Sequence, residues 1–320
     1  MRIALLIGCA VALFGCGGGM PAPAADPSAP ASANASATPA PPIDPAEVEA
    51  ATGIKPEIAD AVVKVSSPRT DVKVEVGGWA APPFMGLTSW VGFTPGEKPG
   101  VRAMIMGDLV LFEDEVSDVM SAALDHGIAV TALHNHFFFD RPHVYFMHIE
   151  AEGEIAPLGQ GVRAALDTIK AIRSKSPQPK DRFDGPALPE KSAIDGAKIE
   201  AILGVKGIAK DGMVKVVIGR PATQAACGCK IGKAMGVNTW AAFAGADDNA
   251  VVDGDFAVAE DELNPVLKSL RGAGIHVVAI HHHMLGEQPR TLFLHYWGRG
   301  PAATLAGAVK KALELTRTAG

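Results

Sequence analysis

The chain has 320 residues, of which 48% are hydrophobic and 20% are charged, and its formal net charge at pH 7 is −6. These proportions are typical of globular proteins, and the length is sufficient for about two ordinary domains. Aromatic residues are scarce and the sequence has no basic stripe, so we expect no nucleic-acid partner.

The first 16 residues have the pattern of a bacterial export signal. Arg2 precedes an apolar run over residues 3–14, which is shorter than the roughly 20 residues needed to span a bilayer. The run ends in Leu13-Phe14-Gly15-Cys16, which resembles the site at which bacterial lipoproteins are acylated. We therefore expect a lipid anchor on Cys16 that holds the protein on the periplasmic side of a membrane or at the cell surface. Cleavage of an ordinary secretory signal nearby is the alternative.

Two segments have the composition of unstructured connections. Residues 17–43 are dominated by Gly, Pro, Ala and Ser and bury too little apolar surface to offset the entropy lost on folding, so we predict a disordered tether. Residues 176–191 are rich in Pro, Lys and Asp and are predicted to be a linker. Only Cys227 and Cys229 remain in the folded part, which excludes a disulfide-rich scaffold.

The rest of the chain consists of two copies of one unit, residues 44–175 and 192–320. Similar blocks recur in the same order, and their spacing changes only between blocks, where loops absorb insertions. The paired blocks are 44–55 with 195–206, 85–93 with 235–243, 107–115 with 254–262, and 134–153 with 281–300. We interpret this pattern as a tandem duplication.

Each copy shows the same order of predicted elements. Asp44 is a candidate N-cap with Pro45 at the first helical position, and a second helix over 113–125 has apolar residues at helical spacing. The other elements predicted in the first copy are strands over 62–76, 90–93, 103–112, 128–136 and 144–150, and a closing helix over 161–172. We therefore predict an α+β fold. It consists of two tandem copies of a mixed, mainly antiparallel sheet with helices packed on one face, related by a pseudo-two-fold axis.

All ten histidines lie in two short windows, residues 126–148 and 276–295. Each window has a His-x-His pair on a predicted strand, a short loop and a third His on the next strand. Alternate residues of a strand point to the same face, so a hairpin of even register brings the three imidazoles together. Such a group can hold Zn²⁺ or Fe²⁺ and leave a position for water. The predicted metal ligands are His134, His136 and His148 in the first copy and His281, His283 and His295 in the second.

Carboxylates near the histidines are candidates for supporting roles. Asp140 and Glu287 each lie four residues after the second His of a pair. Either can be an oxygen ligand or a general base, and the longer reach of Glu287 favours the second copy. Asp108 and Asp255, at equivalent strand positions, and Asp140 are candidates to hydrogen-bond the metal ligands.

A structural explanation of the clusters stays open. A hairpin shifted by one residue separates the third His from the pair, and histidines also hydrogen-bond to one another or to carboxylates in a wet groove. We expect His282 to face the other side of the sheet. The remaining histidines have no His at the equivalent position of the other copy and are expected on the surface: His126, His143 and His276.

Other motifs give weaker signals. Trp90 and Trp240 are expected to pack between layers rather than to contact a ligand. Cys227-Gly-Cys229 is interpreted as incidental, with a soft-metal site or a disulfide as alternatives. The spacing His-x-His-x-x-x-Glu resembles the first motif of the cupins, but the helix predicted over 260–271 is inconsistent with their all-β fold.

Residues 233–298 resemble a known family. Their stretches Gly-Val-Asn-Thr-Trp-Ala-Ala-Phe-Ala-Gly, Val-Val-Ala-Ile-His-His-His-Met and Phe-Leu-His-Tyr-Trp-Gly resemble the LppY/LpqO family of bacterial lipoproteins, as does Thr-Ala-Leu-His-Asn-His in the first copy. The resemblance covers nearly the whole mature chain and implies export and a tandem architecture, but it implies no activity. Phe137-Phe138-Phe139-Asp140 replaces the family's Met-Leu-Gly-Glu, so we expect the second copy to have the stronger site.

These observations lead us to expect a membrane-tethered protein that binds a divalent metal or a small polar ligand at its histidine clusters, with Zn or Fe as candidate cofactors. Two alternatives remain. One is a metal-dependent hydrolase or lyase in which metal-bound water is the nucleophile and Glu287 the base. The other is a structural or interaction module of the cell envelope.

Overall fold

The computed structural model describes residues 42–317. The predicted export signal, the predicted acylation site Cys16 and nearly all of the predicted tether lie outside the described residues. Within the described part, no helix has the length and hydropathy needed to cross a membrane.

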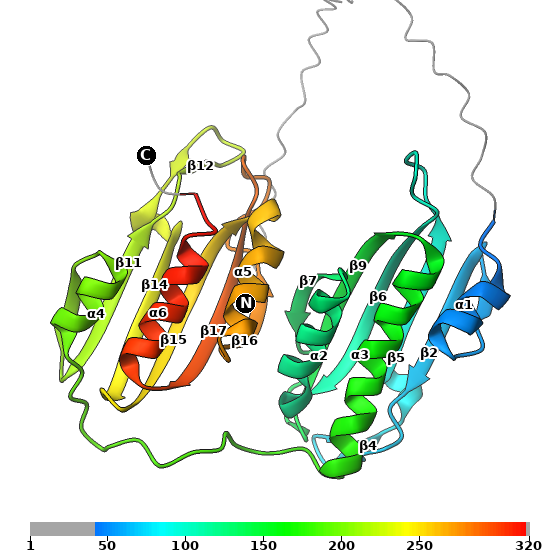
Figure 1. The fold of residues 1–320 in the computed structure, drawn as a ribbon, viewed down its shortest axis with the longest axis horizontal. Helices are drawn as coiled ribbons and strands as arrows, with labels where there is room; N and C mark the ends of the chain where they lie inside the picture. The colour runs from blue at the N-terminus through cyan, green and yellow to red at the C-terminus, as the bar shows by residue number, and fades with distance from the viewer. Residues whose placement is uncertain (1–41, 318–320) are drawn as a thin grey trace, which may run out of the picture. The chain divides into compact units, whose positions relative to one another are not determined.

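Both copies contain the same succession of helices and strands, except that β8 of the first copy has no equivalent strand in the second (Figure 1). The first copy consists of α1 (Pro45–Thr52), β1 (Glu57–Ala59), β2 (Val62–Pro68), β3 (Val74–Val76), β4 (Trp79–Ala81), η1 (Pro83–Met85), β5 (Thr88–Pro95), β6 (Ala103–Phe112), α2 (Glu113–Asp125), β7 (Ala129–His134), β8 (Asp140–Arg141), β9 (Val144–Gly153) and α3 (Ile155–Lys175). The second consists of α4 (Gly196–Leu203), β10 (Gly207–Lys210), β11 (Met213–Gly219), β12 (Thr223–Gln224), β13 (Lys230–Ile231), η2 (Lys233–Met235), β14 (Asn238–Ala246), β15 (Asn249–Ala259), α5 (Glu260–Gly272), β16 (His276–His281), β17 (Thr291–Gly300) and α6 (Ala302–Leu313).

One twelve-stranded sheet runs through both copies, in the order β1-β2-β5-β6-β9-β7-β16-β17-β15-β14-β11-β10. Equivalent strands occupy equivalent positions from either end, since β1 corresponds to β10 and β7 to β16. All ladders between the named strands of this sheet are antiparallel, and the central one pairs Leu133 of β7 with Ile280 of β16. The α+β fold with two tandem copies is therefore confirmed, and the palindromic strand order is the one that a pseudo-two-fold axis requires.

The helices cover one face of the sheet in each copy (Figure 1). Along β9, Met147 and Ile149 point into the main core with the helices, whereas Phe146 joins a second cluster on the opposite side. Since alternate residues share a face, His148 lies on the side of Phe146. We call this side the helix-free face. In the first copy it is partly covered by the small sheet β4-β3-β8.

The first helix of each copy forms for the predicted local reasons. The Asp44 side chain accepts a hydrogen bond from the Ala46 N–H at 2.9 Å, with Pro45 at the first helical position. The helix ends at Gly53, whose φ of 72° lies in the left-handed region that glycine adopts without strain. Asp195 and Gly204 repeat these caps around α4.

The strand predicted over 62–76 is broken, because β2 ends at Pro68 and the chain then turns inward. Arg69 is 6% exposed and donates to Glu115 through both Nη1, at 2.7 Å, and Nη2, at 2.9 Å. Arg220 makes the equivalent buried ion pair with Glu262 in the second copy. An enclosed guanidinium needs such a partner, since an unpaired buried charge is very costly. This duplicated pair therefore anchors the chain directly after β2 and β11.

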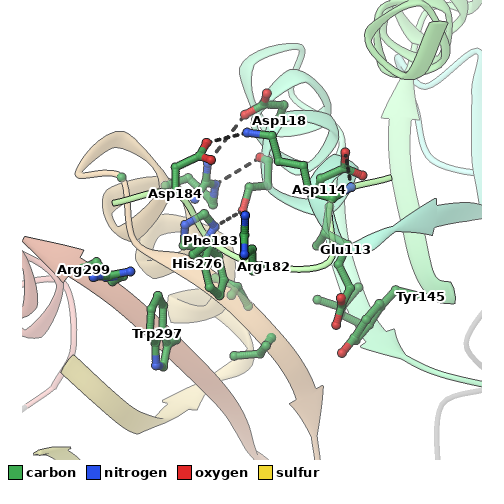
Figure 2. A pocket seen from close by; sticks show the side chains of 18 of the residues that line it. Glu113, Asp114, Asp118, Tyr145, Arg182, Phe183, Asp184, His276, Trp297 and Arg299 are labelled. Carbon is green, nitrogen blue, oxygen red and sulfur yellow. Dashed lines mark hydrogen bonds and ion pairs between the residues drawn. The ribbon is translucent and has the colours of Figure 1, made fainter. Parts of the chain in front are cut away.

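The two copies also meet where α2 of the first copy contacts the beginning of β16. His276 of β16 lies 2.7 Å from the Ser117 hydroxyl of α2, measured from Nδ1 to Oγ, and Figure 2 shows its ring beside Phe183 of the linker segment. The prediction that His276 is a surface residue is therefore wrong: the pairing of β7 with β16 brings it to the junction of the copies.

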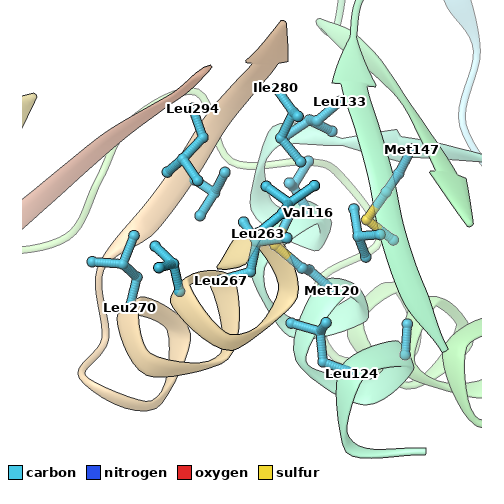
Figure 3. Packing of buried hydrophobic residues seen from close by; sticks show 14 of the residues in the cluster. Val116, Met120, Leu124, Leu133, Met147, Leu263, Leu267, Leu270, Ile280 and Leu294 are labelled. Atoms are coloured by element: carbon cyan, nitrogen blue, oxygen red, sulfur yellow. The ribbon is translucent and has the colours of Figure 1, made fainter. Parts of the chain in front are cut away.

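A single hydrophobic core crosses that junction. Figure 3 shows Val116 and Met120 of α2 beside Leu263 and Leu267 of α5, and these four side chains are at most 6% exposed. Burying side chains of this size stabilises by about 1.5–3 kcal/mol each. The two copies thus form one folded body, to which each contributes six strands of the shared sheet and three α-helices.

Candidate functional site

The second histidine cluster is assembled by the register of three neighbouring strands. His295 of β17 pairs with Ala279 on one side and with Asp255 of β15 on the other, and His281 pairs with Phe293. Directly paired residues share a face of the sheet, so His281, His295 and Asp255 all project from the helix-free face.

The side chains converge closely. Ligand atoms of Asp255, His281 and His295 all lie within 4.8 Å of one another. The imidazoles of His281 and His295 are stacked, with centroids 4.9 Å apart and planes at 6°. His283 flanks the group, since its Nε2 lies 3.1 Å from Nε2 of His281 and 3.6 Å from Oδ2 of Asp255. The three predicted histidines therefore lie together, but the compact trio contains Asp255 in place of His283.

Two buried atoms of this group have no hydrogen-bond partner within the described chain: Oδ1 of Asp255 and Nδ1 of His281. Burial raises the pKa of Asp255 to about 6. Burial, together with the nearby imidazoles of His295 and His283, lowers the pKa of His281 to about 4. His281 is thus neutral at pH 7, the form that ligates a metal. Unpartnered buried polar atoms are costly, and a bound cation would satisfy both.

The first copy repeats the histidines without repeating the compact trio. His134 and His148 are stacked at 5.0 Å and 14°, and Nε2 of His134 lies 3.2 Å from Nε2 of His136. Asp108 pairs with His148 across the strands and has a buried, unpartnered Oδ1. Within the described residues, however, no three ligand atoms of this cluster meet the same 4.8 Å criterion. Burial raises the pKa of Asp108 and lowers that of His134.

The second histidine of each pair is held by an aromatic ring. His136 stacks on Phe146 with centroids 3.4 Å apart, and His283 stacks on Phe293 at 3.5 Å. Phe146 and Phe293 are fully buried. This contact positions each imidazole beside its cluster, above the helix-free face.

Glu287 and Asp140 do not occupy their predicted places. Glu287 is 3% exposed and accepts a hydrogen bond from the Thr291 N–H at 3.0 Å; Asp140 is 2% exposed and accepts one from Val144 at 2.7 Å. Burial alone would raise the pKa of Glu287, but hydrogen bonds from the Thr291 and Glu287 backbone lower it. Both carboxylates therefore hold the loop before β9 or β17. The assignment of Glu287 as a base at the rim is not supported, because its carboxylate is already used in the loop.

The remaining histidines make their polar contacts with residues outside the three-histidine clusters. His282 lies 2.8 Å from Arg290, His126 bonds to the Ala122 carbonyl, and His143 lies 3.4 Å from Asp140.

The tryptophans differ from the expectation of packing between layers. Trp90 pairs with Asp108 and Trp240 with Asp255, so each indole lies on the helix-free face beside its cluster. Lys64 Nζ lies 4.5 Å from the Trp90 ring centroid, and Lys215 Nζ lies 3.9 Å from that of Trp240. Such cation–π contacts contribute roughly 0.5–1 kcal/mol at exposed sites. In the second copy, Cys227 and Cys229 form an exposed disulfide.

A family model described as "Domain of Unknown Function (DUF1259)" matches residues 46–168 and again residues 197–315. The chain belongs to this family. The two matches coincide with the two copies, so each copy is one domain of this family. No curated protein matches the chain.

Among solved structures, the chain is similar to EtuB from Clostridium kluyveri, at 8% identity over 82% of this chain and 90% of that one, with a TM-score of 0.22. It is also similar to the trimeric bacterial microcompartment shell protein PduB, at 12% identity over 81% and 89%, with a TM-score of 0.19. Similarity at this level supports no conclusion about function.

Sequence reasoning missed two features of the site. It placed Asp255 behind the histidines, although the register of β15 against β17 puts it among them. It also missed the buried Arg–Glu pairs. The recurrence of Arg69 as Arg220 and of Glu115 as Glu262 was the signal that would have identified them.

Proposed function

We propose that the second copy binds a divalent transition-metal ion, with Zn²⁺ and Fe²⁺ as candidates, through Asp255, His281 and His295. The observation that carries this proposal is the convergence of three ligand atoms within 4.8 Å of one another, in a group that contains two buried, unpartnered polar atoms. Two imidazoles and one carboxylate are a ligand set used for both ions, and they leave coordination positions open for water or a small polar ligand. The first copy, in this proposal, is a weaker version of the same site.

The cellular location that we propose for this site rests on the N-terminal sequence pattern. In our proposal the chain is an exported lipoprotein of the LppY/LpqO type, anchored through Cys16, and the metal site faces the periplasm or the cell exterior. Acylation of Cys16 is tested by metabolic labelling with a fatty acid analogue. Label that is lost in a Cys16→Ser variant supports the anchor, and label that persists in this variant contradicts it.

A metal-dependent hydrolase or lyase is the second candidate, favoured by the position of His283. Its Nε2 lies within 3.6 Å of Asp255 and 3.1 Å of His281. Burial and His295 lower the pKa of His283, which keeps the imidazole able to accept a proton at pH 7. In this version His283, rather than Glu287, activates water bound to the metal.

Elemental analysis of the full chain, purified without a histidine tag and exposed to Zn²⁺ or Fe²⁺, tests the metal proposal. We expect about one ion per chain, retained in a His134→Ala control and lost in Asp255→Ala and His281→Ala variants. A wild-type chain without bound metal after this exposure would favour the structural or interaction module. Equal retention by the Asp255→Ala and His134→Ala variants would also contradict the proposed ligand set.

A further inference from the structure

The loops at one end of the first copy expose a group of large apolar side chains, which we call the apolar tip. They belong to the β3–β4 hairpin, to η1 and to the loop between β7 and β8. The members of the apolar tip are Trp79, Phe84, Met85, Phe138 and Phe139. Each is at least 52% exposed, and the three phenylalanines are at least 82% exposed. A single exposed apolar residue is ordinary, whereas a group of five requires an explanation.

Backbone contacts hold these loops together. The Gly77 N–H in the β3–β4 hairpin donates to the Phe139 carbonyl at 3.2 Å, and β3 pairs with β8 directly after that residue. Gly86, at the end of η1, lies beside the imidazole of His136, at the start of the same loop. Between these contacts, Phe137 packs inward against the second hydrophobic cluster. The apolar tip is therefore formed by neighbouring loops and not by scattered positions.

The exposed apolar area is large for a protein surface without a partner. A phenylalanine or tryptophan side chain has an area of roughly 150–250 Å², so the three phenylalanines together expose about 400–650 Å². Trp79 and Met85 add to this area. The largest apolar patch on a typical monomer is about 300–600 Å² and is often functional. The apolar tip thus has the size of a surface that another body covers.

The backbone of Phe139 also indicates a role outside the fold. Its φ of 61° lies in the left-handed region, which is unfavourable for a bulky residue. Its ring is exposed, so packing within the chain does not explain why a phenylalanine stands there. Strained positions of this kind cluster at functional sites.

The second copy lacks this aromatic group. At the positions equivalent to Phe84 and Phe139 it has Ala234 and Gly286. It does expose Met235 and Leu285, but none of the exposed large hydrophobic residues described in that copy is aromatic. The apolar tip is therefore a feature of the first copy, which is also the copy without the compact metal-ligand trio.

The composition of the apolar tip and the chain that precedes it favour a lipid bilayer as the covering body. Four of the five side chains are aromatic, and phenylalanine and tryptophan are typical of surfaces that enter the membrane interface. The described chain begins at Pro42, whose carbonyl accepts a hydrogen bond from Arg102 beside the β5–β6 hairpin. Residues 17–42 can span up to about 90 Å, whereas the ten residues of β6 span about 34 Å. An anchor at Cys16 therefore lets either end of the first copy reach the bilayer.

We infer that the apolar tip inserts into the interface of the phospholipid bilayer and holds the first copy against the membrane. The phenylalanine rings enter the boundary between headgroups and acyl chains, and Trp79 lies at the level of the headgroups. A long tether alone fixes no orientation, so the apolar tip supplies it. This inference rests on the lipid anchor proposed above for the proximity of the membrane, and it does not depend on metal binding.

Quenching by brominated lipid tests the insertion. The full chain is reconstituted into phosphatidylcholine vesicles with and without bromine on the acyl chains, and flotation measures the bound protein. Phe138→Trp is the reporter, and Leu285→Trp, at the equivalent position of the second copy, is the matched control. After subtraction of the wild-type signal, we expect bromine to lower the fluorescence of the indole at position 138 at least about twofold. The indole at position 285 should be unaffected.

A second variant tests whether the group inserts as a whole. In the Phe138→Trp background, Phe84→Ala and Phe139→Gly introduce the residues of the second copy. Both side chains are exposed, so the fold should persist. We expect the quenching at position 138 to fall at least about twofold, because less apolar area enters the lipid.

The outcomes separate this inference from the anchor proposal. Quenching at position 138 in a chain that is not acylated at Cys16 supports insertion and contradicts only the anchor. A chain that does not float with the vesicles, no quenching at position 138, or equal quenching at positions 138 and 285 overturns the inference. Self-association without lipid that Phe84→Ala and Phe139→Gly abolish, measured by sedimentation, would assign the apolar tip to a second copy of the chain and would also overturn it.

Discussion

The two histidine clusters contain the same three histidines at the same spacing, yet only the second brings a carboxylate into a compact trio with two of them. Asp108 and Asp255 occupy equivalent positions, each paired with the third histidine of its copy. Small differences in the placement of these side chains in the two copies therefore decide whether ligand atoms meet. The comparison teaches that the His-x-His spacing identifies a candidate region. Whether a compact ligand group forms there depends on the carboxylate that the neighbouring strand contributes.

The loops after the two pairs also differ. Phe139 has a φ of 61°, whereas Gly286, at the equivalent position, has a φ of 70°. A bulky residue in the left-handed region costs roughly 1–2 kcal/mol, and Phe139 is 84% exposed, so little burial offsets that cost. Phe139 thus has an unfavourable backbone conformation in the loop of the first copy. This is also the copy that lacks the compact trio.

The largest expected difference between the copies concerns their buried ion pairs. Glu115 balances two buried cations, Arg69 and Arg173, whereas Glu262 balances one buried cation, Arg220. Removing one partner of a buried pair costs about 3–5 kcal/mol. We expect Glu115→Ala to lower the free energy of unfolding by at least this amount and Glu262→Ala by less, measured by urea unfolding. A larger loss for Glu262→Ala would contradict this ranking.

The second-largest expected difference between the copies is in their affinity for Zn²⁺. We expect Asp255→Ala to weaken Zn²⁺ binding at least about 100-fold, which exceeds the usual effect of a supporting residue, because a direct ligand is removed. Asp108→Ala is the matched control and should change the affinity of the tighter site by less than about threefold, measured by competition with a chelating dye. Similar losses in the two variants would mean that the copies bind metal equally.

Without metal, we expect removal of the Asp255 charge to raise stability, although removal of this side chain weakens metal binding. The pKa of Asp255 is raised to about 6, so its ionised form destabilises the folded state. This penalty is present above that pH and disappears as the pH falls towards the unfolded value near 4. We expect Asp255→Asn to stabilise the metal-free chain by about 3 kcal/mol at pH 8 and by much less at pH 4.

The protonation of His281 has the opposite effect on the pH dependence of stability, because it destabilises the folded chain as the pH falls. Its pKa is lowered to about 4, so the stability it contributes is lost as the pH falls below its unfolded value near 6.5. The diagnostic quantity is therefore the difference between wild type and Asp255→Asn at each pH, and not the pH profile of either alone. If Asp255→Asn is less stable than the metal-free wild type at pH 8, the Asp255 carboxylate is not an uncompensated buried charge, and this prediction is wrong.

The smallest expected effect lies in the two loops. Phe139→Gly should raise the free energy of unfolding by about 0.5–1 kcal/mol by relieving backbone strain, while Gly286→Ala should lower it by about 1 kcal/mol. An added Cβ at Gly286 has space, since its nearest contact is 3.8 Å from Ala226, so only the conformation is tested. Thermal unfolding with both variants would show opposite shifts, and shifts of the same sign would contradict the comparison.

Local patterns in the sequence determined a large part of the fold. The helix predicted over 113–125 coincides with α2, because its first-turn acids and its apolar spacing act within one segment. The duplication determined the tandem architecture, and the period of a strand placed each His-x-His pair near one face. These features depend on residues a few positions apart, whose geometry is set by the backbone itself.

Only the tertiary structure decided how the strands pair over long distances. The ladder between Leu133 and Ile280 merges two sheets into one, and the pairing of β15 with β17 puts Asp255 beside His295. Long-range packing also brings His276 to the junction, whereas Glu287 is held by a hydrogen bond within its own loop. Strand register depends on the sum of many weak contacts between segments far apart in the chain, and a shift by one residue exchanges the faces of every side chain.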